Sequence, residues 1–193
     1  MPRTWRQHLD AHKKGSIETL KELLRIPSIS ADPAHRDDCK RAAEWVLARL
    51  EGAGFDGRLE TVEEGQPIVA ARRIEDEDKP TVTLYGHYDV QPADPLDLWT
   101  TPPFEPTVEK GIIRARGATD DKGQVVANLV ALEALAATDA FPCNVQVLIE
   151  GEEESGGVTL ASLLAREPER TRADAVLVAD SAFFAPGWPA VYT

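Results

Sequence analysis

The sequence predicts an α/β protein with a three-layer α/β/α arrangement around a mixed, largely parallel sheet. Apolar segments of strand length, such as TVTLYGHYDV at 81–90 and NVQVLIE at 144–150, alternate with segments whose apolar residues recur at helical spacing. The 193 residues, 42% of them hydrophobic, are also enough to bury the core of one domain. In folds of this class ligands gather beyond the carboxyl ends of the strands, so residues that follow strands are the first candidates for function.

Two amphipathic helices are expected at the start of the chain. Residues 4–26 and 33–53 both carry apolar side chains at helical spacing. Pro27 ends the first helix, because proline is disfavoured inside a helix. Asp32 and Pro33 suit the N-cap and the first position of the second helix.

The remaining elements alternate between strands and helices, with polar turns between them. Strands are expected at 58–63, 67–74, 81–90, 144–150 and 173–180, and helices at 122–137 and 157–166. A proline-rich loop at 91–106 precedes a hairpin expected around Glu109-Lys110-Gly111. The charged run EDEDKP at 75–80 is interpreted as a solvated turn.

Charge and composition exclude several classes of partner. Lys and Arg number 21 against 33 Asp and Glu, so a net charge of −12 disfavours both nucleic acid and anionic membrane surfaces. The N-terminal stretch MPRTWRQHLDAHKK is too polar for a secretory leader, and no apolar run approaches the roughly 18 residues of a membrane helix. A cytoplasmic location is therefore expected. Cys39 and Cys143 lie far apart without metal-binding spacing, and both are interpreted as free thiols.

Ionisable residues follow three of the expected strands. TLYG leads into His87 and Asp89, VLIEG leads into residues 152–154, and AVLVA leads into Asp180. Parallel strands would bring all of these residues to one edge of the sheet. A fourth group, Asp120-Asp121, lies where a glycine-flanked loop meets a helix.

The combination of one imidazole with several carboxylates indicates a metal centre. In an extended strand His87 and Asp89 point the same way, so the first can bind a metal while the second orients its ring. Nitrogen and oxygen ligands without thiolates suit zinc or manganese, and two such ions can activate a shared water molecule. A glutamate next to a ligating glutamate could accept the proton of that water. From the residues alone, a structural histidine and a solvated acidic turn remain open alternatives.

Four segments in this order resemble the dinuclear metallopeptidases that include carnosine dipeptidases, aminoacylase and acetylornithine deacetylase. The segments are GHYDVQP at 86–92, PPFEPTVEKGIIRARGATDDKG at 102–123, EGEEESGG at 150–157 and VLVAD at 176–180. The motifs ATDDKG and EGxEESG resemble those of the dipeptidase branch more than those of the desuccinylase or deacetylase branches. The resemblance implies hydrolysis of dipeptides or short peptides, with an N-acyl amino acid amidohydrolase as the alternative.

The resemblance also implies the ligands of two divalent ions, zinc first, with manganese or cobalt as alternatives. His87 would bind one ion, Asp120 would bridge both, Glu154 would bind the second, and Asp180 would complete the set of the first. This implied set leaves the neighbouring acidic residues for other roles.

Further roles follow from the same resemblance. Asp89 would support His87, and Glu153 would be the general base, because the motif places the catalytic pair directly before Ser-Gly. Glu152 then falls at a variable position, where we expect it to face solvent. A cis peptide is expected between Asp120 and Asp121.

Relatives of this kind carry a lid domain and a return segment that supplies a last metal-binding histidine. Residues 1–193 are thus expected to form the N-terminal portion of the catalytic domain, with PGWPAVYT at 186–193 beginning another strand and with the lid and return segment absent. His8, His12 and His35 do not match the missing ligand. A homodimer is expected only for a complete enzyme, and a non-catalytic metal-binding fragment is the alternative for this chain.

Overall fold

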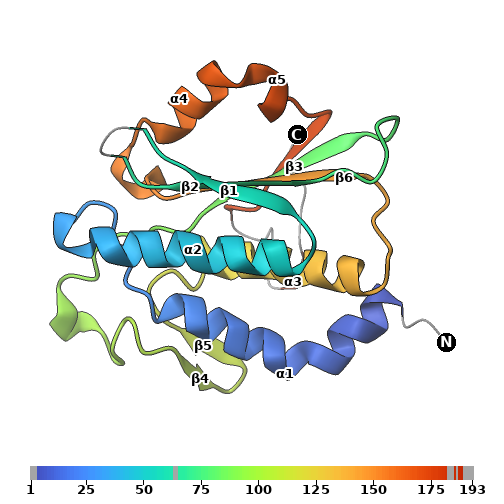
Figure 1. Cartoon of the computed structure of the whole chain (residues 1–193). Coiled ribbons are helices and arrows are strands. Elements are labelled where there is room, and N and C mark those ends of the chain that lie inside the picture. The colour runs from blue at the N-terminus through green and yellow to red at the C-terminus, as the bar shows by residue number, and fades with distance from the viewer. Residues whose placement is uncertain (1–3, 63–64, 182–184, 186, 189–193) are drawn as a thin grey trace.

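The computed structural model describes residues 4–62, 65–181, 185, 187 and 188, and it has three layers (Figure 1). The helices are α1 (Trp5–Leu24), α2 (Arg36–Gly52), α3 (Lys122–Ala137), α4 (Thr159–Arg166) and α5 (Pro168–Thr171). The strands are β1 (Asp56–Glu60), β2 (Ile68–Arg73), β3 (Thr81–His87), β4 (Thr107–Glu109), β5 (Ile112–Arg114), β6 (Asn144–Glu150) and β7 (Ala175–Val178). α2 and α3 cover one face of the main sheet, with α1 packed on α3 beneath them, and α4 and α5 cover the other face. The expected α/β/α class is confirmed.

The main sheet is mixed, with strand order β1-β2-β6-β3-β7. β3 pairs in parallel with both β6 and β7, whereas β2 pairs antiparallel with both β1 and β6. The parallel part of the sheet therefore consists of the three strands that precede the candidate site residues. Their carboxyl ends lie at one edge, as the sequence pattern predicts.

The larger core lies between the sheet and the three helices beneath it. Val46 and Leu50 of α2 and Leu129 of α3 are buried there with the inward residues of the strands, among them Val147. Complete burial of such a side chain stabilises the fold by about 1.5 to 3 kcal/mol. Because helical spacing places these residues on one face of each helix, the fold follows from the apolar pattern of the sequence.

A smaller core joins the opposite face of the sheet to α4. Ile68, Ala70 and Leu148 pack there against Leu163 of the helix. Next to this cluster the Arg58 guanidinium of β1 donates to both carboxylate oxygens of Glu167, the residue before α5, at 2.8 and 3.0 Å. Apolar contacts and ion pairs thus hold α4 and α5 against this face of the sheet.

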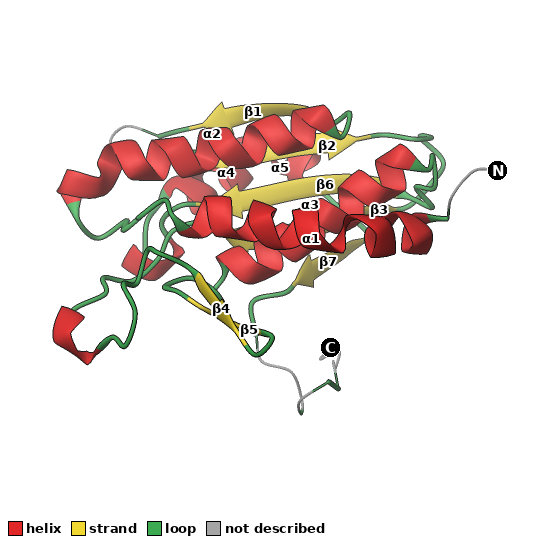
Figure 2. Ribbon diagram, turned by 90° about the horizontal axis from the view of Figure 1, so that it is seen from below, coloured by secondary structure: helices red, strands yellow, loops and turns green. Residues whose placement is uncertain are grey.

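Most elements begin and end close to where the sequence places them. α3 and β6 have the expected bounds, and β4 and β5 form the expected hairpin, which stands apart from the main sheet (Figure 2). Lys110 and Gly111 form its turn with φ of 52° and 81°. Three details differ. The strand expected at 58–63 is β1 at Asp56–Glu60, and the strand expected at 81–90 ends at His87, so Asp89 lies beyond the strand and not on it. Asp32 caps a 3-10 turn at Pro33–His35 and not α2 itself, which begins after that turn. The strand expected at 186–193 falls largely outside the described residues.

Two further expectations concern the cysteines and membrane association. Cys39 is buried and Cys143 is half-buried, and both are free thiols. Within the described ranges, no helix combines the length and apolar character needed to cross a bilayer. The helices are instead amphipathic or packed within the domain.

Candidate metal centre

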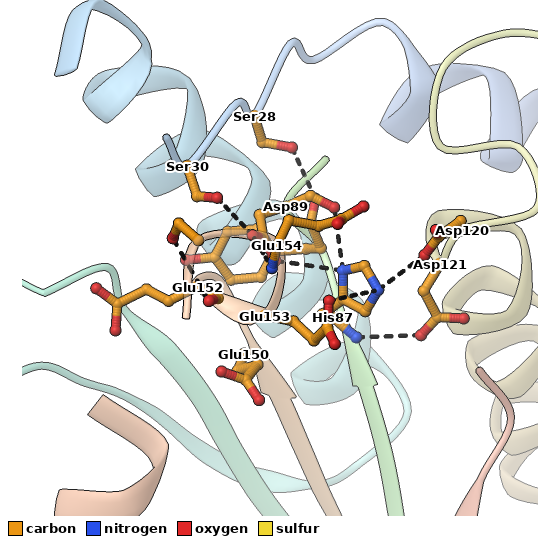
Figure 3. A network of polar contacts seen from close by, with 12 residues as sticks. Ser28, Ser30, His87, Asp89, Asp120, Asp121, Glu150, Glu152, Glu153 and Glu154 are labelled. Carbon is orange, nitrogen blue, oxygen red and sulfur yellow. Dashed lines mark hydrogen bonds and ion pairs between the residues drawn. The ribbon is translucent and has the colours of Figure 1, made fainter. Parts of the chain in front are cut away.

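The predicted site residues come from the ends of β3, β6 and β7 and from the loop before α3, and Figure 3 labels all of them except Asp180. His87 is the last residue of β3, and Glu153 begins a 3-10 turn that follows β6. Asp180 follows β7, and Asp120 comes from the loop before α3. Four chain segments therefore contribute to one cluster, because parallel strands end at the same edge.

The centre of this cluster is the Nε2 atom of His87, whose side chain is buried. Nε2 lies 3.1 Å from Oδ1 of Asp120, 3.5 Å from Oδ2 of Asp180 and 3.9 Å from Oε2 of Glu153. Three carboxylates around one nitrogen repel one another, and a positive charge among them relieves this repulsion. The arrangement therefore favours a proton or a metal cation at Nε2.

The contacts of Nδ1, the other ring nitrogen of His87, leave Nε2 facing the carboxylates. Nδ1 lies 3.1 Å from the main-chain oxygen of Asp89 and 3.2 Å from its Oδ1. Since both atoms can only accept, Nδ1 carries a hydrogen, and Nε2 is the atom that can bind a cation. Burial alone would lower the pKa of His87, but the carboxylates of Asp89, Asp121 and Asp180 raise it to about 10.

Asp121 is buried and contacts the main chain of His87. Its Oδ2 accepts from the main-chain N–H of His87 at 3.1 Å, while its buried Oδ1 has no hydrogen-bond partner among the described residues. Burial raises the pKa of Asp121 to about 7, although the hydrogen bond from His87 opposes this shift. The expected cis peptide between Asp120 and Asp121 is present.

The cluster fits a divalent cation. One ligand atom each of His87, Asp121 and Asp180 lies within 4.8 Å of the others. Asp120, the neighbour of Asp121 in sequence, also contacts Nε2 of His87, and its side chain is 60% exposed. Imidazole and carboxylate donors without thiolate, together with the unpartnered oxygen of Asp121, suit borderline to hard ions.

The two glutamates before Ser155 occupy different surroundings. The Glu153 carboxylate approaches His87 and is 41% exposed; burial and the neighbouring carboxylates raise its pKa, against the effect of the imidazole. Glu154 donates its main-chain N–H to Asp89, and its Oε2 accepts from the Gln91 amide at 2.8 Å. Among the described contacts, Glu153 and not Glu154 reaches the imidazole.

The expectation that Glu152 faces solvent is wrong. Its Oε1 accepts from the main-chain N–H of Gln66 at 3.0 Å, and its Oε2 accepts from that of Thr159 at 3.2 Å. Thr159 begins α4, whose N-cap position is held by Val158, a residue without a side-chain acceptor. A carboxylate is favoured there because the first N–H groups of a helix lack partners. Because Val158 cannot cap the helix, the sequence offered a sign that a nearby carboxylate does so.

Several polar residues that support the site were not predicted. Ser30 donates to the Asp89 carboxylate at 2.6 Å, and Tyr85 donates to Glu150 at 2.6 Å. Gln91 holds Glu154, as described above. Their partners lie 59, 65 and 63 residues away in sequence, so spacing alone gave no signal.

Comparison with known families and proteins places this cluster in context. Residues 83–189, which carry every predicted site residue, match the family described as Peptidase family M20/M25/M40. The chain belongs to this family. Its M20 relatives include the cysteinylglycine-S-conjugate dipeptidase of Corynebacterium striatum, 35% identical over 96% of this chain and 41% of the relative. The human β-Ala-His dipeptidase is 36% identical over 96% of this chain and 39% of the relative.

Solved structures of M20 peptidases agree with these relatives. The chain superimposes on the dipeptidase Dug1p of Saccharomyces cerevisiae with a TM-score of 0.85 and 31% identity, covering 95% of this chain and 42% of that one. For human carnosine dipeptidase 1 the TM-score is 0.86 with 33% identity, covering 92% and 40%. An M20 metallo-carboxypeptidase of Sulfolobus solfataricus is 36% identical, with a TM-score of 0.80 over 87% and 38%. The chain thus spans about two fifths of the length of these relatives.

Proposed function

We propose that the protein is a metal-dependent peptidase that hydrolyses dipeptides or short peptides, with this chain supplying one part of its metal centre. The observation that carries the proposal is the approach of the Glu153 carboxylate to within 3.9 Å of Nε2 of His87, beside two aspartates. A proton acceptor and a set of cation ligands then face the same point. The dipeptidase names of the relatives support the substrate class.

The proposed ligands of two divalent ions are His87, Asp120, Glu154 and Asp180. Asp120 is proposed as the shared ligand because its carboxylate touches Nε2 yet stays largely exposed, whereas one oxygen of Asp121 is already bonded to a main-chain N–H. Zinc is proposed first, with manganese or cobalt as alternatives, because the donors are nitrogen and oxygen. When bound, such ions polarise the scissile carbonyl and acidify a water molecule.

Glu153 is proposed to accept the proton of the attacking water and to pass it to the leaving amine. Its raised pKa suits this role, since a base is most effective when its pKa approaches the working pH. Asp89 is proposed to hold the His87 ring through Nδ1, which keeps Nε2 directed at the cation. Asp89 therefore acts on the ligand and not on the substrate.

The proposal is tested by metal content and by hydrolysis on the same sample. After dialysis, elemental mass spectrometry is expected to find about two divalent ions per protein molecule. Cysteinylglycine, β-alanylhistidine and an N-acetyl amino acid are then compared as substrates, before and after treatment with a chelator. The dipeptides should be hydrolysed faster, in a metal-dependent way.

Other outcomes would replace the proposal. Faster cleavage of the N-acetyl amino acid would make the protein an amidohydrolase. Bound metal without hydrolysis of any substrate would leave a metal-binding chain without catalysis. Absence of bound metal would remove the proposed centre itself.

Metal affinity is expected to increase with pH across the range from 6 to 8. With its pKa at about 10, His87 keeps both ring protons in this range, so a cation must displace one proton. The apparent affinity should therefore rise by about tenfold per pH unit. An imidazole of ordinary pKa, about 6.5, would give a curve that flattens above pH 6.5. Competition with a chromophoric chelator in matched buffers measures the slope.

Three expectations from the sequence stay predictions. They are the cytoplasmic location, the homodimer of a complete enzyme, and the assignment of residues 1–193 to the N-terminal portion of a catalytic domain. For the last, the chain covers 41% and 39% of the length of two dipeptidase relatives, which supports its being a portion of such a protein.

A further inference from the structure

The segment that follows α1 lies against the residues that follow β3. Ser28, which is fully buried, donates its hydroxyl to the main-chain oxygen of Tyr88 at 2.7 Å, and its own main-chain oxygen accepts from Val90 at 3.0 Å. Ser30 instead donates its hydroxyl to Oδ2 of Asp89 at 2.6 Å (Figure 3). Two serines of one short segment thus make different contacts, one with the backbone and one with a carboxylate.

The carboxylate of Asp89 is held from two sides. Its Oδ2 accepts from Ser30 and from the main-chain N–H of Glu154 at 3.1 Å, while its Oδ1 lies 3.2 Å from Nδ1 of His87. The side chain is fully buried, and Oδ1 makes no hydrogen bond among the described residues. Its 3.2 Å approach to Nδ1 is a charge contact, while the hydrogen bond of Nδ1 goes to the main-chain oxygen of Asp89. Fixing Oδ2 therefore determines where Oδ1 points.

The contact from Ser30 is the stronger of the two by its geometry. A hydroxyl 2.6 Å from an ionised carboxylate is in the range of short, charge-assisted hydrogen bonds. The bond from the Glu154 main chain is longer, at 3.1 Å. Without the hydroxyl, one bond remains, and the carboxylate can rotate about its terminal torsion, which is broad in aspartate.

We propose that Ser30 is a positioning residue of the metal centre: its hydroxyl fixes the Asp89 carboxylate, which in turn fixes the ring of His87. The part that concerns the metal rests on the proposed function. The orientation of the ring does not, because every contact in the chain from Ser30 to His87 is made by the protein alone. Ser30 touches neither substrate nor metal in this arrangement.

The test compares Ser30→Ala with Ser28→Ala. Each variant removes one hydroxyl from the same segment, but only the first removes a bond to Asp89. Zinc affinity, measured by competition with a chromophoric chelator, should fall by about tenfold in Ser30→Ala, at the lower end of the range for residues that support a ligand. It should change less than about twofold in Ser28→Ala, and Ser30→Thr, which keeps the hydroxyl, should restore it. Denaturant unfolding of each variant shows the cost to stability.

A second measurement needs no metal. In the metal-free protein the Nδ1 proton of His87 should give a downfield NMR signal that shifts or broadens in Ser30→Ala and stays in place in Ser28→Ala. An unchanged signal in Ser30→Ala, or equal losses of zinc affinity in both alanine variants, would overturn the proposal. If the unaltered protein binds no zinc, the metal centre fails, whereas the NMR comparison still decides the role of Ser30.

Discussion

Replacing Glu153 with Gln is expected to lower the rate of dipeptide hydrolysis by about 10² to 10⁴-fold while the metal stays bound. The amide has nearly the same shape as the carboxylate but cannot accept the proton of the attacking water. Steady-state kinetics with cysteinylglycine and metal analysis of the same preparation measure the two effects. The fall should appear in kcat, because the residue acts on the proton and not on substrate binding.

Two matched variants support this assignment of the base. Glu154→Gln is expected to lower metal content as well as activity, because Glu154 is a proposed ligand. Glu152→Gln should retain hydrolysis, since that side chain holds main-chain N–H groups at the start of α4. Full activity in Glu153→Gln would mean that another group accepts the proton.

Replacing Asp120 with Asn is expected to weaken metal binding by at least about 100-fold, more than the loss of a residue that only supports a ligand. An amide retains one neutral oxygen but removes the charge that a shared ligand supplies to both ions. Asp121→Asn is the matched control, because its amide oxygen can still accept from the main-chain N–H of His87. Chelator competition on both variants measures the difference.

The reverse result would reassign the shared ligand. Asp121 also lies within 4.8 Å of the ligand atoms of His87 and Asp180, so it is the nearest alternative. Strong binding in Asp120→Asn with loss in Asp121→Asn would make Asp121 the ligand. In that case the exposed carboxylate of Asp120 would not be a metal ligand.

The fold was predictable because apolar residues recur at helical spacing in the helices and form short continuous runs in the buried strands. α3 and β6 have the bounds that helical spacing and a continuous apolar run predicted. A mixed sheet was expected, but not that β2 pairs antiparallel with both β1 and β6, which leaves only the pairings of β3 parallel. Pairing direction depends on connections and not on the apolar pattern of a single strand. The three strands that carry the site are parallel, so the predicted gathering of residues at one edge was correct.

The candidate site was predictable in its residue types and less so in its supporting contacts. A histidine and a series of carboxylates after strands identify a cluster, because topology brings strand ends together. Ser30 contacts Asp89 from 59 residues away. Gln91 is close to His87 in sequence, but its partner Glu154 lies 63 residues away, so only the folded chain reveals these two contacts. Glu152 was misjudged because three adjacent glutamates look alike in sequence, although a helix start lacking a cap lies close to the first of them.

β7 has a consequence for how the centre is completed. Val176, Leu177 and Val178 of this strand are 63%, 44% and 53% exposed, and in the described part of the chain its backbone pairs only with β3. Asp180 thus follows a strand that, within the described residues, is joined to the sheet through β3 alone. A cation bound between Asp180 and His87 would fasten the edge strand to the centre of the sheet. The ion would then stabilise the pairing of β7 with β3, and more so as the concentration of the ion rises.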